Sequence, residues 1–166
     1  RGTGNEYVSM LDGTTLPTVS QETGTTFGGS ASSVKVIAGT ADNTFVKSFN
    51  VGDTASYSLS AAIYTNGTLP TTADAELYFD SGTISTTYTS LGNGWYRMKG
   101  TLTGAASLKN YGVLVKAGKT VYLDNLSLAA GTALTSTFNI QNTLTGLGQL
   151  TVESTTTLNS GMANLQ

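Results

Sequence analysis

The sequence predicts an all-β protein, an antiparallel β-sandwich with an extended or β-structured C-terminal appendage. Short stretches that alternate apolar and polar residues recur along the chain, and they are rich in Val, Thr, Tyr and Phe, which favour strands. Gly, Asn and Asp separate these stretches, and helical periodicity is hard to find. Ser and Thr exceed a quarter of the 166 residues, whereas only 11% are charged. Thr suits the solvent-facing side of a strand because it is both β-branched and polar.

The expected strands follow one another at short, regular intervals. After a weak strand at 7–11, alternation predicts strands at 33–38, 44–50, 55–65, 75–80, 84–89, 95–103, 111–116 and 120–128. Turn signals lie between several of them, at Asn66-Gly67, Asp80-Ser81-Gly82, Gly92-Asn93-Gly94 and Ala117-Gly118-Lys119. Eight or nine short strands at this spacing are typical of a sandwich.

The composition changes after Gly131, which divides the chain into a module at 1–131 and an extension at 132–166. The extension has one aromatic residue, Phe138, and one charge, Glu153. Its leucines are scattered among Thr, Gly and Asn, so it cannot form a core alone. We expect a linker, a strand that packs on the sandwich, or a segment that forms a homo-oligomer. Because the chain begins with Arg1 and not with Met, we expect a piece of a longer protein.

The absence of His and Cys excludes several kinds of site. A Ser-His-Asp or Cys-His catalytic site cannot be built, and zinc, haem and iron–sulfur centres lose their usual ligands. A metal would have to be a hard cation held by oxygens, with calcium the first candidate. The net charge of −2 and the scattered basic residues argue against nucleic acid as a partner. No apolar run approaches the about 20 residues of a membrane span, so membrane insertion is not expected.

Four segments between residues 33 and 128 resemble the jelly-roll carbohydrate-binding modules of the family 4, 9 and 22 type. They are Ser33-Val34-Lys35-Val36, Tyr57-Ser58-Leu59-Ser60-Ala61, Gly94-Trp95-Tyr96-Arg97-Met98 and Val121-Tyr122-Leu123-Asp124-Asn125-Leu126-Ser127-Leu128. The last is the most specific, because an Asp inside an apolar final strand is unusual. The resemblance implies a jelly roll, sugar as the partner, and a place in a secreted or cell-surface protein.

The resemblance also implies a structural calcium ion at Asp124. In this family the matching Asp binds calcium with an N-terminal Glu and backbone carbonyls near a Gly-Ser turn. Glu6, Gly28 and Ser30 could supply these groups here. The alternative is that the Asp124 carboxylate accepts hydrogen bonds from backbone N–H groups at a strand end.

Alternation predicts which side chains leave the core and could bind sugar. In the strand at 55–65 we expect Tyr57, Leu59 and Ile63 to face inward. In the strand at 75–80, inward Leu77 and Phe79 leave three polar residues on the opposite face. Aromatic rings stack on sugar C–H groups while charged groups hydrogen-bond the hydroxyls. We therefore expect a sugar-binding sheet face formed by Tyr64, Glu76, Tyr78, Asp80, Trp95, Arg97 and Lys99. The alternatives are a Trp95 that belongs to the core and charges that merely pair across strands.

The sequence favours a non-catalytic function. Glu76 and Asp80 are four residues apart on one strand, about 13 Å, which exceeds the separation that glycoside hydrolysis requires. The first hypothesis is a carbohydrate-binding module of a larger secreted or surface protein. The alternative is a structural or adhesive module of a fibrous surface protein or phage tail fibre. Residues 150–159 resemble repetitive segments of such fibres and adhesins, which favours homo-oligomers formed through 132–166.

Overall fold

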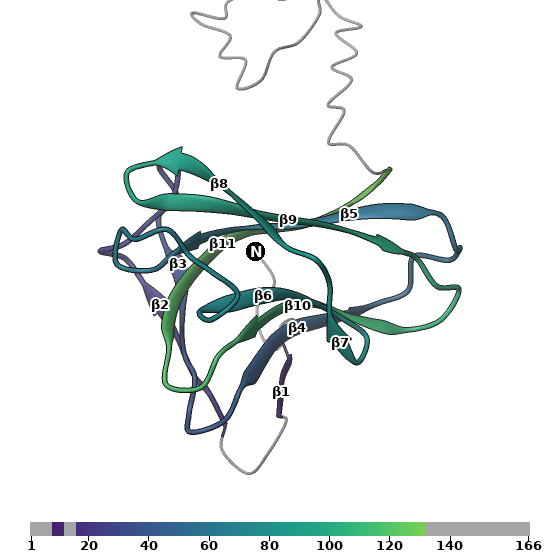
Figure 1. The fold of residues 1–166 in the computed structure, drawn as a ribbon, viewed down its shortest axis with the longest axis horizontal. Coiled ribbons are helices and arrows are strands. Elements are labelled where there is room, and N and C mark those ends of the chain that lie inside the picture. Colours follow the sequence, from purple (N-terminus) through teal and green to yellow (C-terminus); the bar gives the residue numbers. More distant parts are fainter. Residues whose placement is uncertain (1–7, 12–15, 132–166) are drawn as a thin grey trace, which may run out of the picture. The chain divides into compact units, whose positions relative to one another are not determined.

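The computed structural model describes residues 8–11 and 16–131, which form two antiparallel β-sheets packed into a sandwich (Figure 1). The five-stranded sheet has the order β1 (Val8–Leu11), β4 (Asn43–Phe49), β10 (Lys109–Val115), β6 (Ala75–Phe79) and β7 (Gly82–Thr83). The six-stranded sheet has the order β2 (Thr18–Glu22), β3 (Ser33–Ile37), β11 (Thr120–Ala130), β5 (Ser56–Tyr64), β9 (Trp95–Thr103) and β8 (Thr87–Gly92). The predicted all-β sandwich is confirmed.

The connections between strands make the sandwich a jelly roll. From β3 to β6 the chain changes sheet at every connection, and it does so again from β9 to β11. The hairpins β2–β3, β6–β7 and β8–β9 each stay within one sheet. As a result β11, the last described strand, lies in the middle of the six-stranded sheet between β3 and β5.

The core lies between the sheets and follows the alternation of each strand. In β5 the residues Leu59, Ala61 and Ile63 face inward, and in β6 Leu77 does so with Phe79 packed beside it. The buried members of the core come from both sheets: Val36, Ala38, Phe45, Leu59, Ala61, Ile63, Ala75, Leu77, Met98, Leu102, Tyr111, Val113, Val115, Val121 and Leu123. The inward positions expected for Leu59, Ile63, Leu77 and Phe79 are confirmed.

Two strands were not expected from the sequence, and one begins later than expected. β2 lies at the edge of its sheet with mostly exposed side chains, so it lacks the apolar alternation that marks a strand. β7 has only two residues. β8 begins at Thr87 and not at 84, because Ile84 leaves the six-stranded sheet, donates its N–H to the carbonyl of Leu77 and packs against the core.

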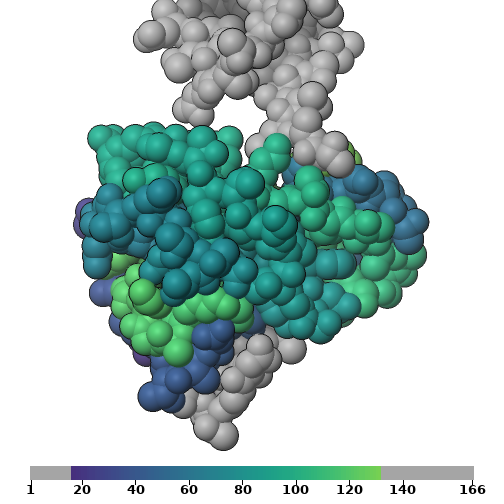
Figure 2. Space-filling view, viewed as in Figure 1, coloured from purple at the N-terminus to yellow at the C-terminus, as the bar shows by residue number. Residues whose placement is uncertain are grey.

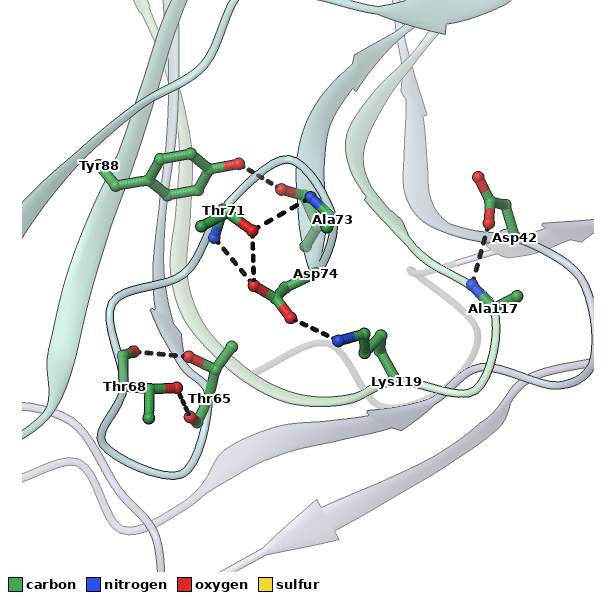
Figure 3. Close-up of polar contacts among 10 residues, drawn as sticks. Asp42, Thr65, Thr68, Thr71, Ala73, Asp74, Tyr88, Ala117 and Lys119 are labelled. Carbon is green, nitrogen blue, oxygen red and sulfur yellow. Dashed lines mark hydrogen bonds and ion pairs between the residues drawn. The ribbon is translucent and has the colours of Figure 1, made fainter.

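One end of the sandwich is fixed by polar contacts among three loops, which we call the loop end: residues 38–42, 65–74 and 116–119. The carboxylate of Asp42 accepts the N–H of Ala117 at 2.9 Å, and Lys119 Nζ lies 2.9 Å from Asp74 Oδ1 (Figure 3). Gly118 donates its N–H to the carbonyl of Gly39 at 2.8 Å. Segments near residues 40 and 118, dark blue and green, accordingly adjoin on the surface (Figure 2).

The chain divides into two units, Arg1–Thr135 and Ser136–Gln166, and the second lies outside the described residues. The prediction of an extended appendage or oligomerisation segment at 132–166 therefore stays a prediction. Within 8–11 and 16–131, no helix has the length and apolar character that crossing a membrane would require.

Candidate functional site

A row of aromatic rings crosses the outward face of the six-stranded sheet. Tyr64 of β5 is the register partner of both Tyr122 on β11 and Trp95 on β9. Its ring centroid lies 5.7 Å from each of theirs, and Phe27 from the β2–β3 loop lies 5.4 Å from Trp95. We call Phe27, Trp95, Tyr64 and Tyr122 the aromatic row. Because Ile63, Met98 and Leu123 point into the core, the alternating positions of the row point away from it.

Trp95 lies on this outward face and is nevertheless buried. Only 4% of its surface is exposed, because Phe27 and Tyr64 pack against it. The expectation of an exposed Trp95 is wrong, and it is also absent from the core cluster. Tyr64, Tyr122 and Phe27 remain partly exposed. A ligand would therefore contact these rings, while Trp95 holds them in place.

The single binding face expected from the sequence is divided between the two sheets. Glu76 and Tyr78 lie on the outward side of β6, in the five-stranded sheet, with Asp80 just after that strand. The other four residues, Tyr64, Trp95, Arg97 and Lys99, lie on the outward side of the six-stranded sheet. The prediction of one shared face is wrong, because the chain changes sheet between β5 and β6 and again between β7 and β8.

The carboxylates of β6 and its surroundings are held in ion pairs. Glu76 lies 2.8 Å from Lys116 Nζ, and Asp80 lies 2.8 Å from Lys109 Nζ. Asp80 also has a left-handed backbone (φ 58°), which places it in the turn after the strand and not in the row of alternating side chains. Ion pairs thus account for both acids, as the alternative interpretation expected for Glu76. That interpretation does not hold for Arg97 and Lys99, which form no ion pair with a described residue.

Tyr88 links the two sheets beside these acids. Its hydroxyl donates a hydrogen bond to the carbonyl oxygen of Ala75 (Figure 3). Burial, together with the negative charges of Glu76 and Asp74, raises the pKa of Tyr88 to about 12. The phenol therefore stays protonated and keeps donating to Ala75 above pH 10, where an ordinary tyrosine would ionise.

The basic residues of the outward six-stranded face differ from those of the other sheet. Lys109, Lys116 and Lys119 all have acidic partners in β6 or the adjoining loops. Lys35, Arg97 and Lys99 form no ion pair with any other described residue. Lys35 Nζ instead lies 5.6 Å from the centre of the Tyr122 ring, a cation–π contact.

Asp124 lies next to the aromatic row, at a bulge in β11. Its Oδ1 accepts the N–H of Asn125 at 2.7 Å, the backbone contact that the alternative interpretation expected. Its Oδ2 is buried and has no hydrogen-bond partner, so this oxygen is unsatisfied. Gly28 and Ser30 lie in the β2–β3 loop, and Glu6 lies outside the described residues.

Calcium at Asp124 therefore stays a prediction. Among residues 8–11 and 16–131, no three acidic side chains gather around a common point where a metal could bind. The orphaned Oδ2 fits one ligand of a hard cation, and the backbone carbonyls of the Gly28–Ser30 turn would have to supply others. Thermal unfolding with calcium and with a chelator tests this prediction. Equal melting temperatures under the two conditions would show that no stabilising calcium ion binds.

Tyr122, Lys35 and Phe27 were missed by the reasoning from sequence. Alternation in Val121-Tyr122-Leu123-Asp124 does place Tyr122 and Asp124 on the same outward face, so part of the signal was present. The pairing of Tyr122 with Tyr64 depends on β11 lying beside β5. The contact of Phe27 with Trp95 comes from a loop, where alternation gives no information.

Comparison with known proteins adds no identification to this geometry. No protein-family model matches the chain, and no curated protein matches its sequence.

Proposed function

We propose that this chain is a non-catalytic carbohydrate-binding module of a larger secreted or cell-surface protein, and that it binds glycan on the outward face of the six-stranded sheet. The observation that carries the proposal is the aromatic row with Arg97 and Lys99 beside it on β9. Partly exposed tyrosine rings can stack on the C–H faces of a sugar. Their hydroxyls and the Arg97 guanidinium can hydrogen-bond the sugar hydroxyls.

The ion pairs of Glu76 and Asp80 support binding without catalysis. A glycoside hydrolase needs two carboxyl groups on either side of the scissile bond. Glu76 and Asp80, the two acids first considered for this role, each form an ion pair with a lysine. Both acids belong to β6 or the turn after it, in the five-stranded sheet, whereas the aromatic row lies on the six-stranded sheet. On the proposed face, Asp124 lies near the row with one oxygen bound to its neighbour's backbone.

Substitution of Tyr122 tests the proposal, with Tyr78 as the matched control on the opposite sheet. One ring contact is worth about 1 kcal/mol, so Tyr122→Ala should weaken glycan binding about fivefold to tenfold, whereas Tyr78→Ala should leave it unchanged. Binding of the full chain is measured first on a glycan array and then by calorimetry with a retained glycan. Thermal unfolding of both variants checks that each is folded.

Two results would contradict the proposal. If the folded wild-type chain binds no glycan, the proposed function is wrong. If Tyr78→Ala and Tyr122→Ala weaken glycan binding equally, or if neither weakens it, the glycan does not bind on this face.

We propose as a second candidate a structural or adhesive module of a fibrous surface protein or tail fibre, in which residues 132–166 associate with other copies. The observation in its favour is their composition, with one aromatic residue and one charge among scattered leucines and threonines. Such a segment needs apolar surface from elsewhere to become ordered. The two functions are compatible in one protein.

A further inference from the structure

Lys35, Arg97 and Lys99 have no acidic partner among the described residues, and all three lie on the proposed binding face. Lys35 lies on β3, and Arg97 and Lys99 lie on β9, each pointing outward from the six-stranded sheet. None of the three pairs with another described side chain of opposite charge. The lysines of the loop end and of β10 are all paired.

The immediate surroundings of Arg97 and Lys99 are uncharged. The cross-strand neighbours of Arg97 are Ala62 and Thr89, and those of Lys99 are Ser60 and Thr87. Ala62 and Ser60 are small and buried, whereas Arg97 and Lys99 are themselves partly exposed. In a chain with only 11% charged residues, two unpaired cations two positions apart on one strand form a distinct positive surface.

The acids of this face leave that surface positive. One oxygen of Glu22, at the edge strand β2, accepts the N–H of Gly24 at 2.7 Å. Asp124 lies beyond Ala62 in the same row as Arg97, and its Oδ2 is buried without a partner. Neither carboxylate reaches the guanidinium of Arg97 or the ammonium of Lys99.

We infer that the glycan bound on this face is anionic, with carboxylate or sulfate groups that pair with Arg97 and Lys99. The inference rests on the proposed function, because the aromatic row must supply the stacking for the same ligand. A guanidinium matches a carboxylate or sulfate through two parallel hydrogen bonds, which a neutral hydroxyl cannot accept equally well. The partner of these cations is then supplied by the ligand instead of by the protein.

Matched pairs of glycans test the inference on the full chain. Polygalacturonate is compared with its methyl ester for the carboxylate, and dextran sulfate with dextran for the sulfate. We expect at least about tenfold tighter binding to the charged member of one pair, which identifies the anionic group. That preference should weaken when salt is raised from about 50 to about 500 mM, since exposed charge pairs are screened.

Charge-neutralising variants show which residues cause the preference for the charged glycan. Arg97→Gln and Lys99→Gln should each reduce it severalfold while binding to the neutral member stays unchanged. Lys109→Gln, which removes the same charge from the five-stranded sheet, serves as the matched control and should keep the preference. Thermal unfolding confirms that all three variants are folded.

The possible failures are distinguishable from one another. Equal binding to charged and neutral members overturns the inference and leaves the proposed function intact. Absence of binding to every glycan overturns the proposed function as well. Equally tight binding to duplex DNA of the same charge density overturns the inference, because the face would then bind any polyanion. An equal loss of preference in Lys109→Gln would overturn the assignment to Arg97 and Lys99.

Discussion

Asp74 has the most polar contacts of any side chain at the loop end. One carboxylate oxygen accepts the N–H and the hydroxyl of Thr71, and the other pairs with Lys119 (Figure 3). Burial alone would raise the pKa of Asp74, but the hydrogen bonds from Lys119 and Thr71 outweigh it and hold the pKa below its ordinary value. A carboxyl with a lowered pKa stabilises the fold above its unfolded pKa of 3.8, and this contribution is lost as pH falls further.

The pKa of Lys116 is shifted in the opposite direction, above its ordinary value. Its hydrogen bond to Glu76 raises its pKa, burial opposes this, and its hydrogen bond to Asp42 adds to the rise. The contribution of Lys116 is therefore fully present below its unfolded pKa of 10.5 and is lost as pH rises through the higher folded value. Together the two groups favour a stability plateau that covers neutral pH.

We predict that Asp74→Asn lowers the free energy of unfolding by about 1 kcal/mol at pH 7, because charge-assisted hydrogen bonds are lost. The difference from wild type should shrink as pH falls below 4, where the wild-type carboxyl also becomes neutral. Urea unfolding of both proteins at pH 7 and pH 3 measures this. A difference that stays constant between the two pH values would show that the charge of Asp74 contributes nothing.

Gly112 determines how closely β10 can approach β4. A Cβ at this position would overlap the carbonyl oxygen of Phe45 and lie 2.8 Å from the Cα of Val46. These are backbone atoms of the neighbouring strand, so no side chain can move aside to make room. β10 lies at the centre of the five-stranded sheet, between β4 and β6, so the pairing on both of its sides depends on this glycine.

We predict that Gly112→Ala destabilises the fold by more than about 2 kcal/mol, or prevents folding, because the two strands must separate. Gly82→Ala in the edge strand β7 is the matched control: its Cβ would meet nothing within 4 Å. That variant should lie within about 0.5 kcal/mol of wild type. Chemical unfolding of both variants measures the two effects. Equal stability of the two would contradict the close approach of β10 to β4.

Turns were the most predictable elements after the central strands. Asn66-Gly67 and Asn93-Gly94 were expected as turns, and all four residues have positive φ angles between 53° and 78°. Their local chemistry is enough to specify a turn. It did not indicate that the two turns touch: a Cβ on Gly94 would lie 2.8 Å from Gly67 Cα and 2.8 Å from Tyr64 Cε2. That contact brings both turns against Tyr64 of the aromatic row.

At the scale of the whole molecule, the last described residue, Gly131, is hydrogen-bonded to β5 of the sandwich. The backbone of Gly131 donates to Ser56 O at 2.7 Å and accepts from Ser58 Oγ at 2.9 Å. Among the described residues, the core cluster takes its members from the strands and loops of both sheets. Removal of everything after Gly131 therefore leaves these contacts in place.

We predict that a chain ending at Gly131 folds as a monomer, whereas the full chain forms oligomers, with trimers the first expectation. Light scattering measures the mass of each, and thermal unfolding compares their stability, which should differ little if 132–166 serve association alone. A full chain that stays monomeric at high concentration would contradict the fibrous second function. It would leave the sugar-binding proposal unaffected.

The sequence by itself determined the fold class, the central strands and which side of each strand faces the core. These properties depend on neighbours within one strand, because side chains alternate with a period of two, and Tyr57, Leu59 and Ile63 accordingly point inward as expected. The same rule correctly placed Glu76 with Tyr78, and Arg97 with Lys99. The alternation rule did not predict the edge strand β2, because the residues of β2 are mostly exposed and bury no apolar face.

Only the tertiary structure decided which strands share a sheet, and with it the composition of the candidate site. Alternation states which way a side chain points but not which strand lies beside it, so residues of β6 and β9 were assigned to one face although they belong to different sheets. Pairing of β11 with β5 brought Tyr122 to Tyr64, and a loop placed Phe27 over Trp95. Both contacts join segments far apart in the chain, whereas the alternation pattern reports only on neighbours along one strand.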